Sequence, residues 1–278
     1  MSYTNGLDKP VNFHQTETWS SQDTSIDTIN FAPDWVWIKS RTNADTQVIF
    51  DTVRGANKRL SSSGSGAVST TSDELTAFNS DGYTLGTGSN VNRSGHNYVS
   101  WNWLAGGSAP SQTYTVKVVS DSGNKYRFDD FGTSAVTLDL QEGGTYTFDQ
   151  SDSSNSGHPL RFSTTSDGSH GGGSEYTTGV TTTGTPGSAG AKTVITVGSS
   201  VATLYYYCSS HSGMGGQANT NSTHGSSNFS GSIQSTVSAN TTAGFSIVKY
   251  DGNNNGTTTT IGHGLGGVPE MYIVKSLD

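Results

Sequence analysis

Residues Leu204–Gly216 read LYYYCSSHSGMGG and combine a β-strand pattern with residue types that bind soft metals. The first four residues are bulky and mostly aromatic, which favours a strand that runs directly into Cys208. His211 and Met214 follow at Cys-x-x-His-x-x-Met spacing, and three glycines in the second half let the chain bend tightly. The stretch therefore predicts a strand followed by a short loop that carries three metal-ligand types.

A second histidine lies upstream, where GHPLRF (157–162) places His158 at the start of another expected strand. A thiolate, two imidazoles and a weak axial thioether are the donors of a type 1 copper site. We therefore take His158, Cys208, His211 and Met214 as candidate metal ligands. Copper is the first expectation and zinc the second. The alternative is a site without metal, because a lone cysteine is usually a small buried apolar residue.

These residues resemble the cupredoxin family. The match rests on His158 before an alternating strand and on YCSSHSGM (207–214), and it covers the segment 113–220. The resemblance implies a Greek-key sandwich with His158, Cys208 and His211 as equatorial ligands and Met214 as the axial one. The long Gly-rich stretch 164–190 departs from a compact electron carrier, so we expect a structural role for the metal at least as much as electron transfer.

The remaining sequence also favours strands. Charged residues make up only 13% of the 278-residue chain, whereas aromatic residues reach 10%, which is enough to build several small cores. Short alternating runs are separated by turn dipeptides such as Asp81-Gly82, and the one short helix candidate is Ser72–Phe78. We expect an all-β, multi-module β-sandwich protein with a central Greek-key cupredoxin-like domain.

An internal repeat divides the chain. PDWVWIKS (33–40) matches PEMYIVKS (269–276), and each copy reads as a proline, an acidic residue and an apolar strand before Lys-Ser. We expect three segments: an N-terminal β-sandwich module over 1–107, the cupredoxin-like sandwich over 113–220, and an incomplete second copy of the N-terminal module over 243–278. The polar tract 221–242 is expected to be a linker or an irregular loop. A longer chain or another chain would complete the last segment.

The outer segments resemble a module of tail-fibre and other virion proteins of tailed bacteriophages, especially marine ones. The residues that carry the resemblance are FAPDWVWIKSR (31–41), DTVRG (51–55), FNSDGY (78–83), YVSWNW (98–103) and GHGLGGVPE (262–270). The resemblance implies a fibre or appendage subunit with a cupredoxin-like insert. It also implies trimers, other virion proteins as partners, and contact with a host cell-surface receptor.

Charge and the absence of known motifs exclude several classes of partner and activity from the expectation. The net charge of −8 comes without a basic cluster, so we expect no nucleic-acid partner. No apolar run is long enough to predict membrane insertion. The segment 1–9 lacks the apolar core of a signal peptide, which favours a virion protein made in the host cytoplasm. Nucleophile-elbow and nucleotide-loop motifs are absent, so we expect no enzyme.

The leading expectation is thus a structural subunit of a bacteriophage virion appendage, a tail or head fibre, with a metal-binding domain. A copper-binding redox or electron-transfer protein is the alternative. An adhesin that binds glycans through exposed Trp and Tyr side chains is a third interpretation.

Overall fold

The structure is a computed structural model that describes residues 9–21, 23–253 and 256–278, and most of its regular elements are strands. The chain forms two compact units. Unit 1 comprises Met1–Gly107, Ser238–Ile247 and His263–Asp278, and unit 2 comprises Ser108–Val237 and Val248–Gly262. The expectation of an all-β protein built from sandwiches is confirmed.

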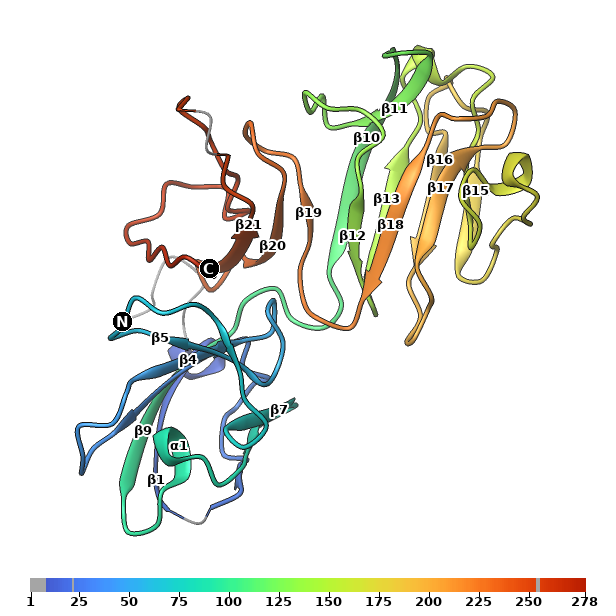
Figure 1. Cartoon of the computed structure of the whole chain (residues 1–278). Coiled ribbons are helices and arrows are strands. Elements are labelled where there is room, and N and C mark those ends of the chain that lie inside the picture. Colours follow the sequence, from blue (N-terminus) through green and yellow to red (C-terminus); the bar gives the residue numbers. More distant parts are fainter. Residues whose placement is uncertain (1–8, 22, 254–255) are drawn as a thin grey trace. The chain divides into compact units, whose positions relative to one another are not determined.

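Unit 2 is a sandwich of two sheets (Figure 1). The first sheet has the order β11 (Asn124–Phe128), β10 (Ser111–Ser120), β13 (Thr145–Asp149), β16 (Lys192–Thr196) and β15 (Val180–Thr183). The second has the order β12 (Leu138–Gln141), β18 (Gly216–Asn221), β17 (Leu204–Cys208) and β14 (Leu160–Ser163). β10 runs parallel to β13 and β12 parallel to β18, whereas the other pairs are antiparallel.

Aromatic side chains from both sheets fill the core of unit 2. Phe148 is fully buried, and its ring centroid lies 5.5 Å from that of Tyr114 and 5.4 Å from that of Phe162. The buried tyrosines keep their hydroxyl groups paired, as buried polar groups must. Tyr114 donates to the Ser227 carbonyl at 2.9 Å, and Tyr206 donates to the Val136 carbonyl at 2.6 Å.

Unit 1 contains two further sheets. The larger one has the order β1 (His14–Ser20), β9 (Asn97–Trp103), β3 (Trp35–Ser40), β4 (Val48–Asp51), β5 (Lys58–Ser61) and β6 (Ser69–Thr70). The smaller one has the order β2 (Ser25–Ile26), β8 (Gly82–Leu85) and β7 (Leu75–Asn79). Val36 and Ile38 of β3 are fully buried in the core of this unit, together with Tyr83 of β8.

Among the described residues, a fifth sheet and four short helices complete the regular structure. The sheet has the order β19 (Ser226–Asn228), β20 (Ser235–Asn240) and β21 (Phe245–Tyr250). The helices are η1 (Pro10–Asn12), α1 (Ser89–Asn92), η2 (Ser153–Asn155) and η3 (Gly168–Gly171). In the part of the chain that the structure describes, no helix has the length and apolar character needed to cross a membrane.

Three local expectations were wrong. Ser72–Phe78 does not form a helix, because Leu75–Asn79 pairs with Gly82–Leu85 in a hairpin that buries Leu75. The tract 221–242 is not only linker: it contains β19 and β20, and Phe229 lies in the core of unit 2. Met271–Val274 forms no strand, and its side chains are exposed. An apolar segment without a partner strand has no ladder to hold it extended.

Arg54 forms a buried ion pair within unit 1. Its Nε lies 2.6 Å from an Asp51 carboxylate oxygen, and both side chains are nearly inaccessible. Asp34 accepts hydrogen bonds from the Thr52 hydroxyl and from the backbone N–H of Ala105. Both carboxylates therefore satisfy buried donors of unit 1.

Replacing Phe148 with alanine should lower the free energy of unfolding of unit 2 by about 3–5 kcal/mol, because the cavity left among the aromatic rings cannot close completely. Urea denaturation followed by circular dichroism measures the change. Thr181→Ala, on the exposed side of β15, is the control and should change stability by less than about 0.5 kcal/mol. Equal effects of the two substitutions would contradict this account of the core.

Candidate metal centre

The register of one strand pair brings distant residues of unit 2 together. β14 pairs antiparallel with β17, and Leu160 lies opposite Cys208. His158 precedes β14 by two residues, so the chain places it just beyond the end of β17. His211 follows Cys208 in the loop between β17 and β18, and it therefore returns to the same end of the sheet.

Three of the four predicted ligands form a cluster. The Cys208 Sγ lies 3.8 Å from His158 Nδ1 and 3.8 Å from His211 Nδ1, and the potential ligand atoms all lie within 4.8 Å of one another. A nitrogen about 2.0 Å and a sulfur about 2.3 Å from a shared ion are about 3.5–3.7 Å apart at tetrahedral to trigonal angles, close to the observed values. The separations therefore fit one shared transition-metal ion.

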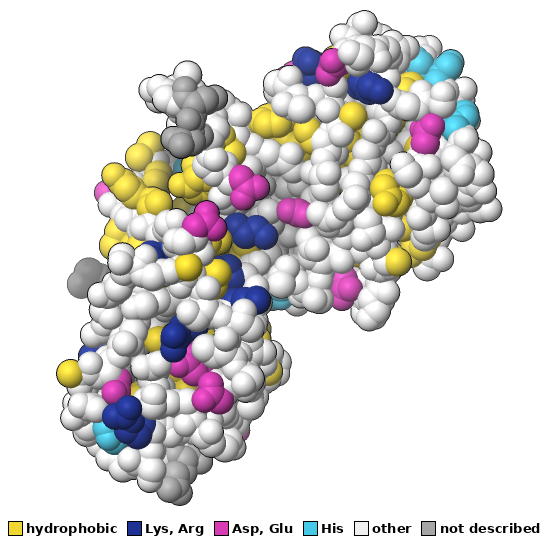
Figure 2. Space-filling model, viewed as in Figure 1, with side chains coloured by type: hydrophobic (Ala, Val, Ile, Leu, Met, Phe, Trp, Pro, Cys, Tyr) yellow, Lys and Arg dark blue, Asp and Glu magenta, His cyan; other side chains and the backbone are white. Residues whose placement is uncertain are grey.

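The cluster joins a buried thiol to two imidazoles at the surface. Cys208 is fully buried, His158 is half-buried and His211 is exposed. In the space-filling view, histidine side chains gather at one end of unit 2 (Figure 2). Burial, and secondly the neighbouring His211, lower the pKa of His158 below its ordinary value. The neutral imidazole, which is the form that binds metal, is thereby favoured.

Buried polar groups fix the backbone of His158. Its carbonyl accepts hydrogen bonds from the Tyr126 hydroxyl and from Gln150 Nε2, both at 2.9 Å, and its N–H donates to the Asn155 carbonyl at 2.8 Å. Gln150 also accepts from the Leu160 N–H at 3.1 Å, which ties the same side chain to β14. Burial, and secondly the nearby Cys208, raise the pKa of Tyr126, so its hydroxyl stays protonated and remains a donor.

Residues outside the loop that carries His211 form hydrogen bonds with the loop backbone. The Gly213 N–H donates to Asp167 Oδ1 at 2.9 Å, and its carbonyl accepts from Lys125 Nζ. The Met214 carbonyl accepts from the Tyr126 N–H at 3.0 Å. These contacts define the course of the loop without any contribution from the imidazole of His211, whose Nδ1 remains directed at the thiol.

Two further residues have different outcomes. Met214 is buried in the same core cluster as Cys208, and its role as a fourth, axial ligand stays a prediction. His170, which the sequence did not single out, forms a 3.0 Å hydrogen bond through its Nε2 with the Cys208 carbonyl. Nothing in the spacing of His170 indicates this contact, because it depends on the fold of the loop around η3.

Among the described residues, His158, Cys208 and His211 are the one group of three or more His, Cys, Asp or Glu side chains close enough to share an ion. With one thiol and two imidazoles, the group can hold a soft or borderline transition metal.

The chain belongs to the family described as Domain of unknown function (DUF7483), whose model matches residues 9–127 and 217–278. The candidate ligands His158, Cys208 and His211 all lie between the two matched ranges, so the match does not extend to them. No curated protein and no solved structure matches the chain.

Gly215→Ala should disrupt this centre, because a Cβ at that position would collide with the backbone carbonyl of Tyr206 in β17. We expect a destabilisation of more than about 1 kcal/mol and weaker metal binding, measured by thermal unfolding and by titration with Zn²⁺. Gly132→Ala is the matched control, since a Cβ there has open space around it. Unchanged stability and binding in Gly215→Ala would contradict the tight packing of the loop.

Proposed function

We propose that this DUF7483-family protein binds one transition-metal ion through His158, Cys208 and His211. The observation that carries the proposal is the pair of 3.8 Å separations from one buried sulfur to two imidazole nitrogens. A thiol and two imidazoles directed at one another are also the donor types that soft or borderline transition metals accept.

Copper is the first candidate and zinc the second. Both ions accept thiolate and imidazole donors, so the three clustered residues alone do not determine which of the two metals binds. A long thioether bond from Met214 would complete a cupredoxin-like type 1 copper site, as the sequence resemblance implies. A structural zinc ion would instead need a fourth donor at normal bond length, because such sites are almost always four-coordinate.

The main role that we propose for the metal is structural. It would link the approach to β14, the end of β17 and the loop before β18, three segments that the β14–β17 and β17–β18 ladders already bring close together. Binding free energy adds to folding free energy when the unfolded chain has no preformed site. Electron transfer is the second candidate, and it is favoured by the exposure of His211, which gives a redox partner access to a ligand edge.

We further propose that the whole chain is a non-enzymatic subunit of a bacteriophage virion appendage, a tail or head fibre that contributes to host attachment. The support is the resemblance carried by FAPDWVWIKSR (31–41) and YVSWNW (98–103). The proposal includes assembly as a trimer, contacts with other virion proteins and binding to a host cell-surface receptor.

Adding Cu(II) to the purified protein should produce one bound ion and an intense blue charge-transfer band, whereas Zn²⁺ should bind without colour. At about 100 times the dissociation constant, the free energy of unfolding should rise by about 2.7 kcal/mol. Elemental analysis, absorption spectra and denaturation with and without a chelator measure these effects. A fast reversible redox couple without any stabilisation would favour the electron-transfer alternative.

The matched variants are His211→Ala, which removes an exposed ligand, and His263→Ala, which removes a histidine outside the cluster. The first should abolish the stabilisation by metal and the second should retain it. Equal binding by both variants, or no binding by the native chain, would show that the cluster does not hold metal.

Mass spectrometry of purified virus particles should detect this chain, and its mass in solution should be that of a trimer. Absence from particles whose host cells contain the protein would contradict the virion proposal. That result would leave the metal measurements unaffected, so the two proposals can fail separately.

A further inference from the structure

One face of the large sheet of unit 1 carries four tryptophans. The alternation along β3 sends Val36 and Ile38 into the core and Trp35 and Trp37 to the opposite face. In the register of β3 and β9, Trp35 lies opposite Trp103 and Trp37 opposite Trp101. All four side chains are only half-buried, so this face exposes a contiguous aromatic surface.

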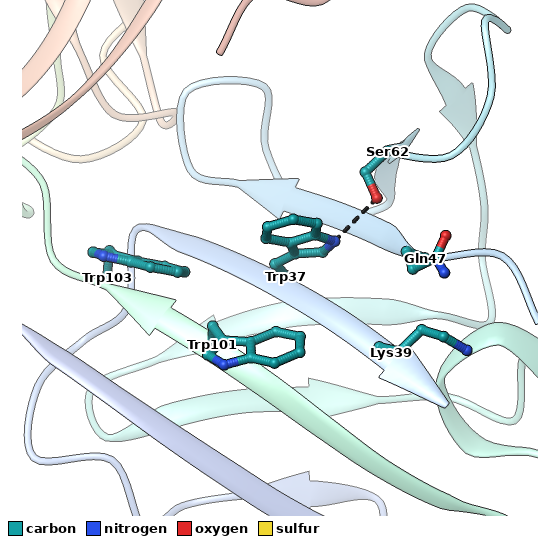
Figure 3. Close-up of a pocket in the computed structure, with 6 residues that line it drawn as sticks. All are labelled: Trp37, Lys39, Gln47, Ser62, Trp101 and Trp103. Atoms are coloured by element: carbon teal, nitrogen blue, oxygen red, sulfur yellow. Dashed lines mark hydrogen bonds between the residues drawn. The ribbon is translucent and has the colours of Figure 1, made fainter. Parts of the chain in front are cut away.

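Three of these tryptophans line a hollow of about 630 Å³, whose lining residues are Trp37, Trp101, Trp103, Lys39, Gln47 and Ser62 (Figure 3). Every lining residue belongs to unit 1. The volume lies within the range of about 300–1,000 Å³ that is typical of small-ligand sites. The hollow combines broad aromatic walls with a few polar groups, which is the composition expected of such sites.

Contacts among the aromatic rings hold the walls in place. The ring centroids of Trp37 and Trp101 are 5.8 Å apart, and those of Trp35 and Trp103 are 4.8 Å apart. Trp37 Nε1 donates to the Ser62 hydroxyl at 3.0 Å, as the dashed line in Figure 3 shows. A ligand would therefore meet rings that are already ordered, which reduces the entropy cost of binding.

The polar groups of the hollow are suited to a neutral ligand. Lys39 Nζ donates to the backbone carbonyls of Ser40 and Asn43, so its charge is already solvated by the protein. Within the described chain, the side-chain amide of Gln47 has no hydrogen-bond partner, and it can both donate and accept. The Ser62 hydroxyl accepts from Trp37 and keeps its own proton to donate.

Charge and polarity exclude the other common ligands of aromatic sites. A nucleic acid needs clustered cations, whereas this hollow has one lysine and the chain a net charge of −8. A quaternary ammonium group would be repelled by Lys39. A wholly apolar ligand would bury the Gln47 amide without a partner.

We propose that this hollow binds a saccharide. A pyranose ring presents a face of C–H groups that can pack against the indole rings, and hydroxyl groups at its edge that can pair with Gln47 and Ser62. This inference goes beyond the metal centre and does not depend on it, because the ligand residues and the hollow belong to different units. No covalent step is involved.

An array of neutral oligosaccharides, probed with the full-length protein, tests the proposal, and calorimetry then gives the affinity for the best glycan. Binding should also change the intrinsic fluorescence, since all five tryptophans lie within residues 1–107. Trp37→Ala and Trp101→Ala should each weaken binding on the order of tenfold or more. Gln47→Ala should weaken it less and should change which glycans bind.

Tyr272→Ala removes an exposed aromatic ring outside the hollow and is the matched control, and His211→Ala tests independence from the metal. Both variants should bind like the native chain. Trp37→Phe keeps an aromatic face and should retain part of the affinity, which separates loss of stacking from loss of folding. No binding across the array, equal binding by Trp37→Ala, or self-association that Trp37→Ala abolishes would overturn the proposal.

Discussion

The antiparallel pairing of β14 with β17 is the constraint on which the candidate metal centre depends. It sets Leu160 against Cys208, and this register alone decides that His158 meets the thiol. A shift by one residue would turn Cys208 to the other face of the sheet. The buried amide of Gln150 reinforces the register, because it binds both the His158 carbonyl and the Leu160 N–H. The backbone itself therefore sets the geometry of the cluster.

The strands and part of the candidate site could be predicted from the sequence, because residue alternation and short spacings can be read from neighbouring residues. Cys208 and His211 are three residues apart after an aromatic strand, and the alternation of Trp35–Ile38 indicates which side chains share a face. Proximity of His158 to Cys208 required the resemblance to a known family, since their separation of fifty residues carries no local signal. The role of His170 could not be predicted, because it depends on how a glycine-rich loop folds back on Cys208.

The errors have a common physical origin. Leu75–Asn79 has apolar residues at helical spacing, but cross-strand pairing with Gly82–Leu85 decides its conformation. Residues 226–240 look like linker because Ser, Thr and Asn dominate, yet their hydroxyl groups satisfy buried partners: the Ser226 hydroxyl meets Tyr146, and the Ser227 hydroxyl accepts from the Asp139 N–H. Polar composition indicates exposure only when no neighbouring element needs hydrogen-bond partners.

The position of the ligand residues between the two matched ranges of the family has an evolutionary consequence. Residues 128–216 contain the whole ligand cluster, whereas the tryptophan-bearing strands β3 and β9 lie within 9–127. Selection can therefore alter residues 128–216 without changing a residue of the aromatic hollow. Family members that share the tryptophan strands need not share His158, Cys208 and His211, so the two regions can diverge independently.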